Sequence, residues 1–590
     1  MLPDMPIIKK YDVIIVGGGM SGVCAAIACA RHGAKTALIQ NRPVLGGNAS
    51  SEIRMHICGA DQHGQRPDAR ETGILEEILL DNRIRNPQNS FSILDTILWE
   101  KARFQDGLEL YLNTHMTGAV MEGSRINKIT ALQLTTEKLF ELEAKIFLDA
   151  TGDGTLAVMA GAEYMSGREG KNVFAEKYAP DESDRVTMGN TLLFKAVDAG
   201  KPVPFIKPYW AGTYNEEDLT YRNHDEITSG YWWIELGGDR LDVIGDGEII
   251  RDELLKAVYG VWDHIKNSGR HNADNYCLDW VGFLPGKRES RRITGDYILK
   301  EQDLLAGRIF DDAVAYGGWP MDMHVAGGLG VRLEPTLFIH MDEVYTIPYR
   351  SLYSRNVENL MLGGRAISAS HMAFGSTRVM ATCAVIGQAG GTAAAMATEK
   401  GILPREILTH IKELQQRLLK DDCHIPGVKN EDAGDMAKRA RISCSSSIPG
   451  GECENAVNGI SRKIKDDTNC WISEAVDGEW LAVKFGKTVS VSQVHLKFDS
   501  NLSKELMISL SRSTLSEQIP GIPPQLVKDY SIEFYKDGKL VYTRQITGNY
   551  MRFTKHDFSF VECSSVKVRV SSTHGDPHAR IFEIRVYGDE

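Results

Sequence analysis

The sequence predicts an α/β domain of Rossmann type, interrupted by an inserted domain and followed by a C-terminal all-β sandwich. Three observations support this fold class. A strand, a glycine turn, a helix and a second strand follow one another at residues 11–40, as in a βαβ unit. A second strand–turn–helix pattern occupies residues 144–164. Short alternating strands with turn signals fill residues 480–588, which is typical of a sandwich.

The length of the chain requires several structural units. Its 590 residues exceed the size at which a single hydrophobic core stops growing, about 250–300 residues. We expect a discontinuous α/β domain at residues 1–160 and 335–400, and an inserted substrate or cap domain, aromatic and irregular in pattern, at residues 161–334. A helical linker at residues 401–435 and the sandwich at residues 436–590 follow.

Composition and charge describe an ordinary globular protein. The chain is 42% hydrophobic and 25% charged, with a net charge of −12. It has no basic block, which argues against nucleic acid as a partner because phosphate binding requires clustered Lys and Arg. Residues 379–397 carry no charge and approach the length of a membrane span, but their Ala, Gly, Thr and Gln content indicates a buried helix. We therefore expect a soluble protein without a membrane span.

Two further patterns bear on metals and on location. No CxxC pair is present, so the ligand spacing of zinc ribbons and iron–sulfur relays is missing, and we expect no metal site. The N-terminal segment has no charged-then-apolar leader with a cleavage site. We expect a cytoplasmic protein; the alternative is an exported protein whose signal peptide is not in this chain.

A glycine-rich turn follows the first expected strand. Gly17, Gly19 and Gly22 form a G-x-G-x-x-G motif between the strand YDVIIV and the helix VCAAIACARH. Gly17 permits a tight turn, Gly19 lets the backbone approach a pyrophosphate, and Gly22 lets the helix pack closely on the sheet. The N–H groups at the helix N-terminus, around Met20 and Ser21, favour phosphate. The turn therefore predicts a dinucleotide ligand.

The residue expected to hold the ribose departs from the usual pattern. The strand KTALI is followed by Gln40, where a dinucleotide-binding domain usually carries a carboxylate. An amide oxygen also accepts hydrogen bonds, and its nitrogen donates, so Gln40, with Asn41 and Arg42, is expected to hold the ribose less strongly. The alternative is that Gln40 only ends a strand at the surface.

Three later features indicate a flavin rather than a nicotinamide cofactor. Gly46 and Gly47 in RPVLGGN offer a second close approach of the backbone. ATGDG at residues 150–154 ends a strand without a side chain to obstruct the ligand. GGRAIS at residues 363–368 precedes the small-residue helix at residues 379–397, whose positive end suits the charge of a reduced flavin. The alternative is that this helix is only a tightly packed core helix.

These segments together resemble a known family. VIIVGGGMSG, RPVLGGNASSE, LDATGDG, PGKRESRRI and GGRAIS are similar to the FAD-dependent oxidoreductase family of the glutathione-reductase-type flavoprotein superfamily, over about residues 10–400. The resemblance implies FAD as the cofactor, with adenosine at residues 17–40 and flavin near Gly47, Asp153 and Ser376. It does not fix a substrate. The residues expected to bind FAD are Gly17, Gly19, Met20, Ser21, Gly22, Gln40, Asn41, Arg42, Gly46, Gly47, Asn48, Ser51, Thr151, Gly152, Asp153, Gly364, Arg365, Ser376 and Arg378.

Two histidines and one aspartate are candidates for proton transfer, which must occur within hydrogen-bond reach of the reacting group. His371 precedes the helix expected to face the flavin, and His324 lies in the loop GGWPMDMH, two residues after Asp322. We expect both histidines to be catalytic and Asp322 to orient or charge-balance His324; the alternative for each histidine is a structural role. Glu52 and His56 follow the second glycine pair and are expected to face the substrate.

Basic and aromatic runs in the inserted segment are candidates for binding the substrate. GKRESRR at residues 286–292 contains Arg288 and Arg291, which either clamp an anionic substrate or form ion pairs within the protein. In YWW, Trp232 and Trp233 either stack on a sugar ring or fill the core.

The C-terminal segment resembles the discoidin, or coagulation-factor type C, sandwich of the galactose-binding-like class. ENAVNGISR, NCWISE, EWLAVKFGKTVSVSQVHLKFD and ARIFEIRVYG carry this resemblance. It implies a fold more firmly than a ligand: such modules bind glycans or serve as docking and oligomer surfaces. His574 and His578 in HGDPH are expected to form a polar turn rather than a metal site.

Three functional hypotheses follow. The first is an FAD-dependent dehydrogenase or oxidase that oxidises a hydroxyl group of a carbohydrate or glycoside-like small molecule. The second is a flavin-dependent reductase of an unsaturated carboxylate, with the basic run clamping the acid. The third is a glycan-binding scaffold with a vestigial flavin domain.

Overall fold

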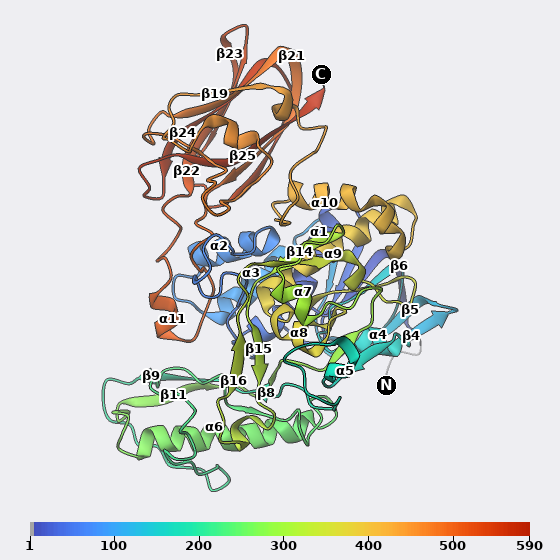
Figure 1. Ribbon diagram of the computed structural model, residues 1–590, viewed down its shortest axis with the longest axis vertical. Coiled ribbons are helices and arrows are strands. Elements are labelled where there is room, and N and C mark those ends of the chain that lie inside the picture. Colours follow the sequence, from blue (N-terminus) through green and yellow to red (C-terminus); the bar gives the residue numbers. More distant parts are fainter. Residues whose placement is uncertain (1–4, 590) are drawn as a thin grey trace. The chain divides into compact units, whose positions relative to one another are not determined.

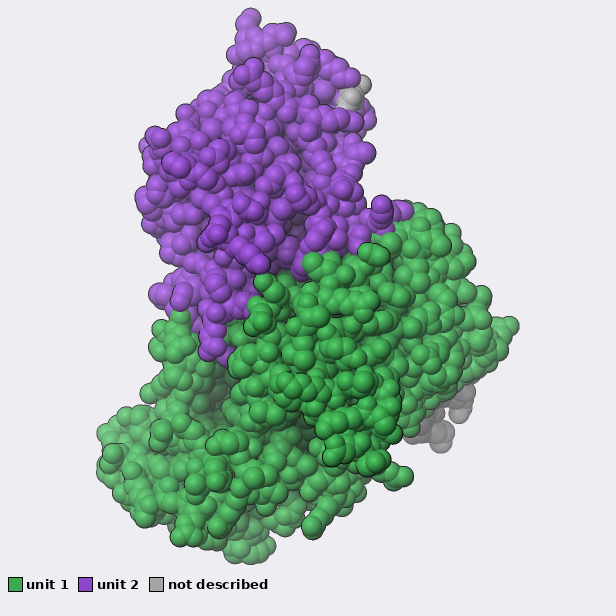
Figure 2. Space-filling view, viewed as in Figure 1, with its two compact units in different colours: residues 1–62, 89–411, 507–517 green, residues 63–88, 412–506, 518–590 purple. Residues whose placement is uncertain are grey.

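The computed structural model describes residues 5–589, which divide into two compact units (Figure 1, Figure 2). The first unit comprises residues up to 62, 89–411 and 507–517; the second comprises residues 63–88, 412–506 and 518 onward. Residues 63–88 therefore differ from the predicted boundaries, which placed them in the first domain. In this segment the Arg70 guanidinium donates to the backbone carbonyls of Ser500 and Asn501 at 3.0 and 2.9 Å, which ties the segment to the second unit.

The first unit is built on a seven-stranded sheet of order β3-β2-β1-β6-β5-β4, with β18 paired to β6. Strands β3, β2, β1, β6 and β18 are parallel, while β5 and β4 continue the sheet in antiparallel fashion. The predicted βαβ opening is confirmed. The strands are β1 (Ile7–Val16), β2 (Thr36–Ile39), β3 (Leu108–Tyr111), β4 (Thr114–Glu122), β5 (Arg125–Gln133), β6 (Lys138–Asp149) and β18 (Leu360–Leu362).

Two small-residue helices, α1 (Met20–Arg31) and α9 (Met380–Lys400), pack against each other beside this sheet. A Cβ atom at Gly387 would lie 2.1 Å from the Ser21 carbonyl oxygen, and one at Gly391 would lie 2.1 Å from that of Ala25. Only glycine allows the two backbones to come this close. The expected burial of residues 379–397 is also confirmed, since nearly all of α9 before its last turn is inaccessible to solvent.

No single helix among residues 5–589 is both long and apolar enough to cross a membrane. Helix α8 (His371–Thr377) and α9 reach the length and apolar character of a membrane span only when they are taken together, and they are bent by 93° relative to each other. The other helices of four or more residues are α2 (Ile74–Arg85), α3 (Phe91–Arg103), α4 (Thr155–Met159), α5 (Lys171–Phe174), α6 (Gly247–Asn267), α7 (Glu301–Leu305), α10 (Ile411–Lys420) and α11 (Arg512–Ser516), with 3₁₀ turns at Pro404–His410, Met436–Arg439 and Cys453–Val457.

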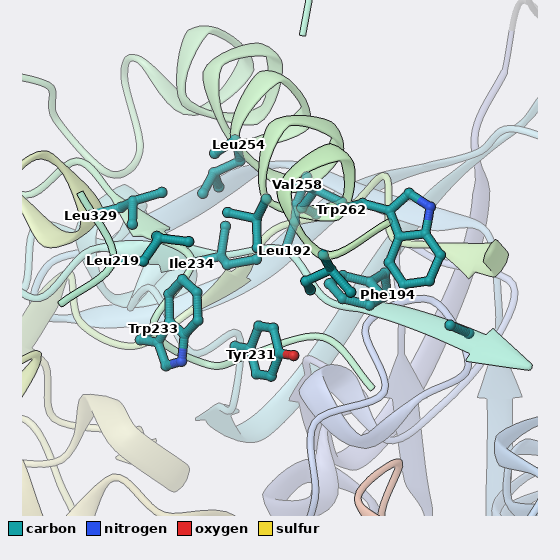
Figure 3. Close-up of a cluster of buried hydrophobic side chains, with 14 of the residues drawn as sticks. Leu192, Phe194, Leu219, Tyr231, Trp233, Ile234, Leu254, Val258, Trp262 and Leu329 are labelled. Carbon is teal, nitrogen blue, oxygen red and sulfur yellow. The ribbon is translucent and has the colours of Figure 1, made fainter. Parts of the chain in front are cut away.

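The inserted segment is more regular than its sequence pattern indicated. The 21-residue helix α6 was not predicted, although its buried residues Ile250, Leu254, Val258, Val261 and Ile265 recur every three or four positions, the spacing of one helix face. These residues pack with aromatic side chains from the preceding strands and loops (Figure 3). Trp233 and Trp262 are 3% and 0% exposed in this core.

Short antiparallel pairs complete the inserted segment and its flanks. The hairpin β15–β16 is important for the site because it pairs Asp322 with Phe338 and His324 with Thr336. The strands are β7 (Tyr164–Ser166), β8 (Asn190–Thr191), β9 (Phe194–Asp198), β10 (Glu235–Leu236), β11 (Tyr276–Val281), β12 (Gly286–Lys287), β13 (Arg291–Ile293), β14 (Ala313–Gly317), β15 (Met321–His324), β16 (Thr336–Ile339) and β17 (Tyr345–Pro348).

The second unit contains an antiparallel seven-stranded sheet of order β20-β25-β21-β24-β22-β23, with β19 beside β21. The predicted all-β C-terminal domain is confirmed, although two expected strands join into the single 19-residue strand β21. The strands are β19 (Arg441–Cys444), β20 (Trp471–Ile472), β21 (Trp480–Phe498), β22 (Val527–Lys536), β23 (Lys539–Ile546), β24 (Phe553–Thr573) and β25 (Arg580–Asp589).

Candidate active site

The first glycine turn connects β1 to α1, and its glycines serve either close packing within the protein or open space for a ligand. A Cβ atom at Gly17, whose φ is +106°, would lie 2.2 Å from the Ala150 carbonyl oxygen, and one at Gly22 would lie 1.8 Å from the Gly17 oxygen. A Cβ atom at Gly19 would meet no protein atom within 4 Å. Protein packing therefore requires glycine at positions 17 and 22, whereas the open space at Gly19 suits the approach of a ligand.

The second glycine pair lies directly against the first turn. The Gly46 N–H donates to the Gly18 carbonyl at 2.8 Å, and Gly46 and Gly47 have φ values of +101° and +58°. A Cβ atom at Gly47 would lie 3.1 Å from the Gly19 Cα. Two segments of exposed backbone therefore meet at Gly19, as expected for a cofactor that runs along both.

Gln40 is 6% exposed and braces both glycine loops. Its Oε1 accepts from the Gly18 N–H at 2.9 Å, and its Nε2 donates to the Val44 carbonyl at 3.1 Å. Gln40 thus does not simply end a strand at the surface. Asn41 is exposed and Arg42 half-buried beside it. The ribose contact of these three residues stays a prediction, because the amide of Gln40 already has protein partners on both atoms.

Two aspartates near the end of β6 lie in different environments, Asp149 as the last residue of the strand and Asp153 in the ATGDG segment that follows it. Asp149 is fully buried and accepts from the N–H groups of Thr151 and Ala157, both at 2.8 Å. Asp153 is clamped by Lys287 Nζ at 2.8 Å and by an Arg365 nitrogen at 2.9 Å. Burial opposes ionisation of Asp153, but these two cations outweigh it and lower its pKa to about 2.

Gly152 and the GGRAIS segment close the space around the first turn. A Cβ atom at Gly152, whose φ is +80°, would lie 2.8 Å from the Arg365 guanidinium. Those at Gly363 and Gly364 would lie 2.9 and 3.2 Å from the Ser21 side chain. Loops from β1, β6 and β18 therefore meet at the N-terminus of α1.

Two buried polar atoms at this junction lack a hydrogen-bond partner among the described residues, and they show how the surrounding residues could accommodate FAD. Within residues 5–589, Ser21 Oγ and Arg365 Nε are buried and have no hydrogen-bond partner. Buried polar atoms are normally satisfied, and a pyrophosphate at Gly19 would offer acceptors to both a hydroxyl and a guanidinium. The open space at Gly19, the helix N-terminus and these two donors fit the cofactor that the sequence implies.

A second group of predicted residues gathers around His324, whose side chain is 3% exposed. His324 Nδ1 lies 2.6 Å from Glu235 Oε2, and His324 Nε2 lies 3.2 Å from Asp322 Oδ2. Asp322 also accepts from Thr336 Oγ1 across the β15–β16 hairpin. The rings of Trp232 and His324 are nearly perpendicular, with 5.3 Å between centroids and 82° between planes.

Two arginines balance the carboxylates of the His324 cluster. Arg288 lies 3.4 Å from Glu235, and Arg378 lies 2.8 Å from Asp322. Burial raises the pKa of Glu235, but Arg288 and His324 outweigh it and hold that pKa below its ordinary value. Burial likewise opposes ionisation of Asp322, and His324 and Arg378 hold its pKa well below the usual range. Both carboxylates are therefore ionised at neutral pH.

His371 belongs to a separate buried cluster. Its Nδ1 lies 2.9 Å from Glu289, and its backbone N–H donates to Glu169 at 2.8 Å. Arg292 pairs with both carboxylates and is 0% exposed. The two clusters are linked through the chain: Glu289 accepts from the Met188 N–H at 3.0 Å, and Glu235 accepts from the next N–H along.

The other predicted residues lie around or away from these clusters. Asn48 Nδ2 donates to the Lys287 carbonyl at 3.0 Å, and the Ser51 N–H donates to Asp95 at 3.1 Å. Met20 is buried, and Glu52, His56 and Arg291 are half-buried. Ser376 Oγ lies 2.6 Å from Tyr345 Oη inside the core. Trp233 stacks on Tyr231 and donates to the Asn223 carbonyl at 2.8 Å, so it forms part of the core of the inserted segment.

Glu235, which contacts His324 and pairs with Arg288, was not predicted from the sequence. The sequence feature that could have identified Glu235 is its position in the run GYWWIELGG, where it is the single carboxylate and follows four apolar or aromatic residues. A buried carboxylate needs a partner, so this position could have been matched to one of the basic candidates. In the turn HGDPH, His574 Nε2 and His578 Nδ1 each face a backbone carbonyl, at 2.7 and 2.8 Å.

Comparisons with known proteins agree with this geometry. A family model described as FAD dependent oxidoreductase matches residues 12–418. The tRNA uridine 5-carboxymethylaminomethyl modification enzyme MnmG of Caldicellulosiruptor saccharolyticus is 27% identical over 178 residues, 27% of each chain. Dihydrolipoyl dehydrogenase of Trypanosoma brucei brucei is 52% identical over 42 residues, 7% of this chain and 9% of that protein. The matches span about a quarter or less of the length of these relatives.

The C-terminal part is similar to solved carbohydrate-binding modules. A fucose-binding module of Streptococcus pneumoniae is 14% identical, with a TM-score of 0.21, over 26% of this chain and 98% of that one. The lectin domain of lectinolysin in complex with Lewis B antigen is 17% identical, with a TM-score of 0.20, over 28% of this chain and 100% of that one.

The family match covers most of the chain and includes every segment that forms the two glycine loops and the donors around them. FAD is the cofactor of that family, and Gly19, Ser21 and Arg365 provide the open backbone and the donors that its pyrophosphate requires. The chain belongs to the FAD-dependent oxidoreductase family.

Proposed function

We propose that this oxidoreductase oxidises a hydroxyl group of a carbohydrate or glycoside-like substrate. The observation that carries the proposal is the imidazole of His324, buried between two ionised carboxylates and next to the half-buried ring of Trp232. Oxidation of an alcohol releases a hydride and a proton. Acceptance of the hydride is the chemistry that bound FAD supplies, so the protein must supply a base for the proton.

His324 is suited to that role by the unequal distances of its two carboxylates. The shorter contact, 2.6 Å from Nδ1 to Glu235, fixes the tautomer that carries its proton on Nδ1. For Nε2 to take the proton of the substrate hydroxyl, that hydroxyl must replace the Asp322 carboxylate, which faces Nε2 at 3.2 Å, at the ring nitrogen. The resulting imidazolium is stabilised by Glu235 on one side and Asp322 on the other, in the manner of a base held by an orienting carboxylate.

Binding of the substrate is assigned to Trp232, because aromatic faces suit the apolar face of a sugar ring. Arg288 is less suited to clamp an acid. It already donates to Thr191 Oγ1 at 2.6 Å and to the Trp232 carbonyl at 2.7 Å, and it pairs with Glu235. These contacts favour alcohol oxidation over reduction of an unsaturated carboxylate, whose binding would draw on the same guanidinium.

The experiment is anaerobic mixing of the flavoprotein with a panel of sugars and glycosides while the flavin absorbance near ~450 nm is recorded. Bleaching by at least one of them supports the proposal. If dithionite-reduced protein is instead reoxidised by unsaturated acids and not by keto-sugars, the reductase hypothesis replaces it. If no compound changes the flavin spectrum but the full chain binds glycans, the scaffold hypothesis replaces both. The glycan ligand of residues 436–590 stays a prediction from the sequence resemblance.

A further inference from the structure

Four metal-ligating side chains converge in the inserted segment, apart from the His324 and His371 clusters. They are Glu216, His224, His264 and His271, and one ligand atom from each lies within 4.8 Å of all the others. His264 belongs to α6, His271 to the turn after it, and the other two to the loop before β10. None of the four takes part in the proposed reaction.

The separations match a tetrahedral metal site. His264 Nε2 lies 3.0 Å and His271 Nε2 lies 3.6 Å from Glu216 Oε1. The two imidazole nitrogens are 3.3 Å apart, and His224 Nε2 lies 3.7 Å from the other oxygen of Glu216. Zinc bonds of about 2.0–2.1 Å in a tetrahedron place neighbouring ligand atoms roughly 3.3–3.4 Å apart. Three of the four atoms therefore lie close to the spacing that a single ion needs, and the fourth, on His224, lies within 4.8 Å of each of them.

The protonation pattern of His224 suits a ligand. Its Nδ1 lies 2.5 Å from the backbone carbonyl of Arg222. A carbonyl only accepts, so Nδ1 carries the hydrogen and Nε2 keeps its lone pair when the ring is neutral. Metal-binding histidines commonly donate their second ring N–H to a carbonyl or carboxylate in this way.

The loop that carries His224 is held from several directions. Tyr231 Oη donates to the His224 carbonyl at 3.0 Å, and Trp233 Nε1 donates to the Asn223 carbonyl at 2.8 Å. Both rings belong to the core of the inserted segment (Figure 3). Arg222 donates to the carbonyls of Gly328 and Val331 at 2.9 and 3.1 Å. The loop position is therefore fixed without a metal, as a preorganised site requires.

The histidines are shielded while the carboxylate reaches the surface. The side chains of His224, His264 and His271 are 10%, 5% and 11% exposed, whereas that of Glu216 is 38% exposed. Arg270 is 3.8 Å from Glu216 and 66% exposed, so its side chain lies at the rim.

We propose that Glu216, His224, His264 and His271 bind one divalent transition-metal ion of the zinc type. Three imidazoles and one carboxylate at tetrahedral spacing favour zinc over Mg²⁺ or Ca²⁺, which prefer oxygen ligands in larger number. With four protein ligands the site is structural. It would join the loop at residues 216–224 to α6 and to the turn after α6, independently of the flavin.

The test uses the full-length flavoprotein with any affinity tag removed and treated with a chelator. Calorimetric titration with Zn²⁺ alone should give one ion per chain at neutral pH. Binding should weaken as the pH falls below about 6.5, where protons compete for the imidazoles. His271→Gln and Glu216→Gln should each lower the affinity at least about tenfold. His115→Gln, an exposed histidine on β4, should bind as the wild type does.

Two results would overturn the site. One is wild-type protein that binds no Zn²⁺ at neutral pH. The other is Zn²⁺ binding that neither substitution weakens, which would place the ion elsewhere. FAD content of each variant reports whether the first unit is folded. If His271→Gln loses FAD, the comparison of Zn²⁺ affinity rests on Glu216→Gln alone, because the Glu216 side chain is more exposed and its substitution disturbs the fold less.

Discussion

Substitution of Gly19 by alanine separates the needs of the cofactor from those of the protein. Gly19 has φ −67° and ψ 178°, which alanine adopts without strain, and its Cβ would meet no protein atom within 4 Å. The apoprotein should therefore stay within about 1 kcal/mol of the wild type, because the restriction of the unfolded chain by alanine opposes its weaker preference for the N-cap position of α1, which Gly19 occupies. The same methyl group would occupy the path assigned to the pyrophosphate.

The expected loss of affinity follows from the cost of overpacking. An added methyl in a filled site costs about 1–3 kcal/mol, which corresponds to a roughly 5- to 150-fold weaker Kd. The assay is a fluorescence titration of apoprotein with FAD, combined with thermal unfolding of the apoprotein. Gly22→Ala should lose both stability and FAD, because its Cβ would lie 1.8 Å from the Gly17 oxygen. Gly247→Ala, which meets no atom within 4 Å at the start of α6, is the control.

The reasoning about the first turn would be refuted by a Gly19→Ala protein that binds FAD with wild-type affinity. It would also be refuted if this variant were destabilised without FAD by more than the change of N-cap residue explains, about 1 kcal/mol, since no protein atom lies near the new methyl group.

Three further predictions address the surroundings of the cofactor. Gln40→Ala removes the partners of the buried Gly18 N–H and of the partly buried Val44 carbonyl, so FAD affinity should fall by about 1–3 kcal/mol while the rate of flavin reduction at full FAD occupancy stays unchanged; loss of that rate would contradict the placement. Asp153 has a pKa lowered to about 2, so its ionisation stabilises the fold above the unfolded pKa of about 3.9, by about 2 kcal/mol, and this is lost as the pH falls through about 2. Denaturant unfolding of Asp153→Asn should show that deficit at pH 7 and a smaller one at low pH, with the exposed Asp181→Asn as the control; a deficit independent of pH would contradict the assignment. Gly387→Ala should lower the Tm, because the added Cβ would lie 2.1 Å from a backbone oxygen of α1. Gly390→Ala should lower the Tm less, because its Cβ would meet only a flexible side chain at 3.2 Å; equal effects would contradict the packing of α1 on α9.

The cofactor site could be predicted because its signals are local. The glycines at positions 17, 19 and 22 lie within six residues, and the flanking strand and helix are set by short-range patterns. The roles of Gly17 and Gly22 in packing, and of Gly19 in leaving space, are visible in the structure as the sequence motif implies.

The surroundings of His324 could be predicted only in part, because they depend on contacts between distant segments. His324 and Asp322 are neighbours along one strand, but Glu235 and Arg378 reach them from positions more than fifty residues away. No rule of sequence spacing predicts that such distant residues lie in contact. The prediction would have to come from burial, because buried charges need a partner of opposite charge.

The inserted segment shows the same limit more clearly. Its aromatic residues suggested irregular structure, and the apolar face of α6 was overlooked. That helix places His264 beside the loop of Glu216 and His224. The metal site that we propose there spans separate segments and carries no motif of the CxxC kind, so the absence of that motif from the sequence does not bear on it.

The measurement that tests the proposed reaction most directly is the rate of anaerobic flavin reduction by a sugar that bleaches the wild-type protein. His324→Gln should slow that rate by about 10²–10⁴-fold, the usual contribution of a general base, with its FAD content unchanged. His371→Gln should lose less, because His371 belongs to the separate cluster with Glu289. An unchanged rate in His324→Gln, or a greater loss in His371→Gln, would contradict the assignment of the proton to His324.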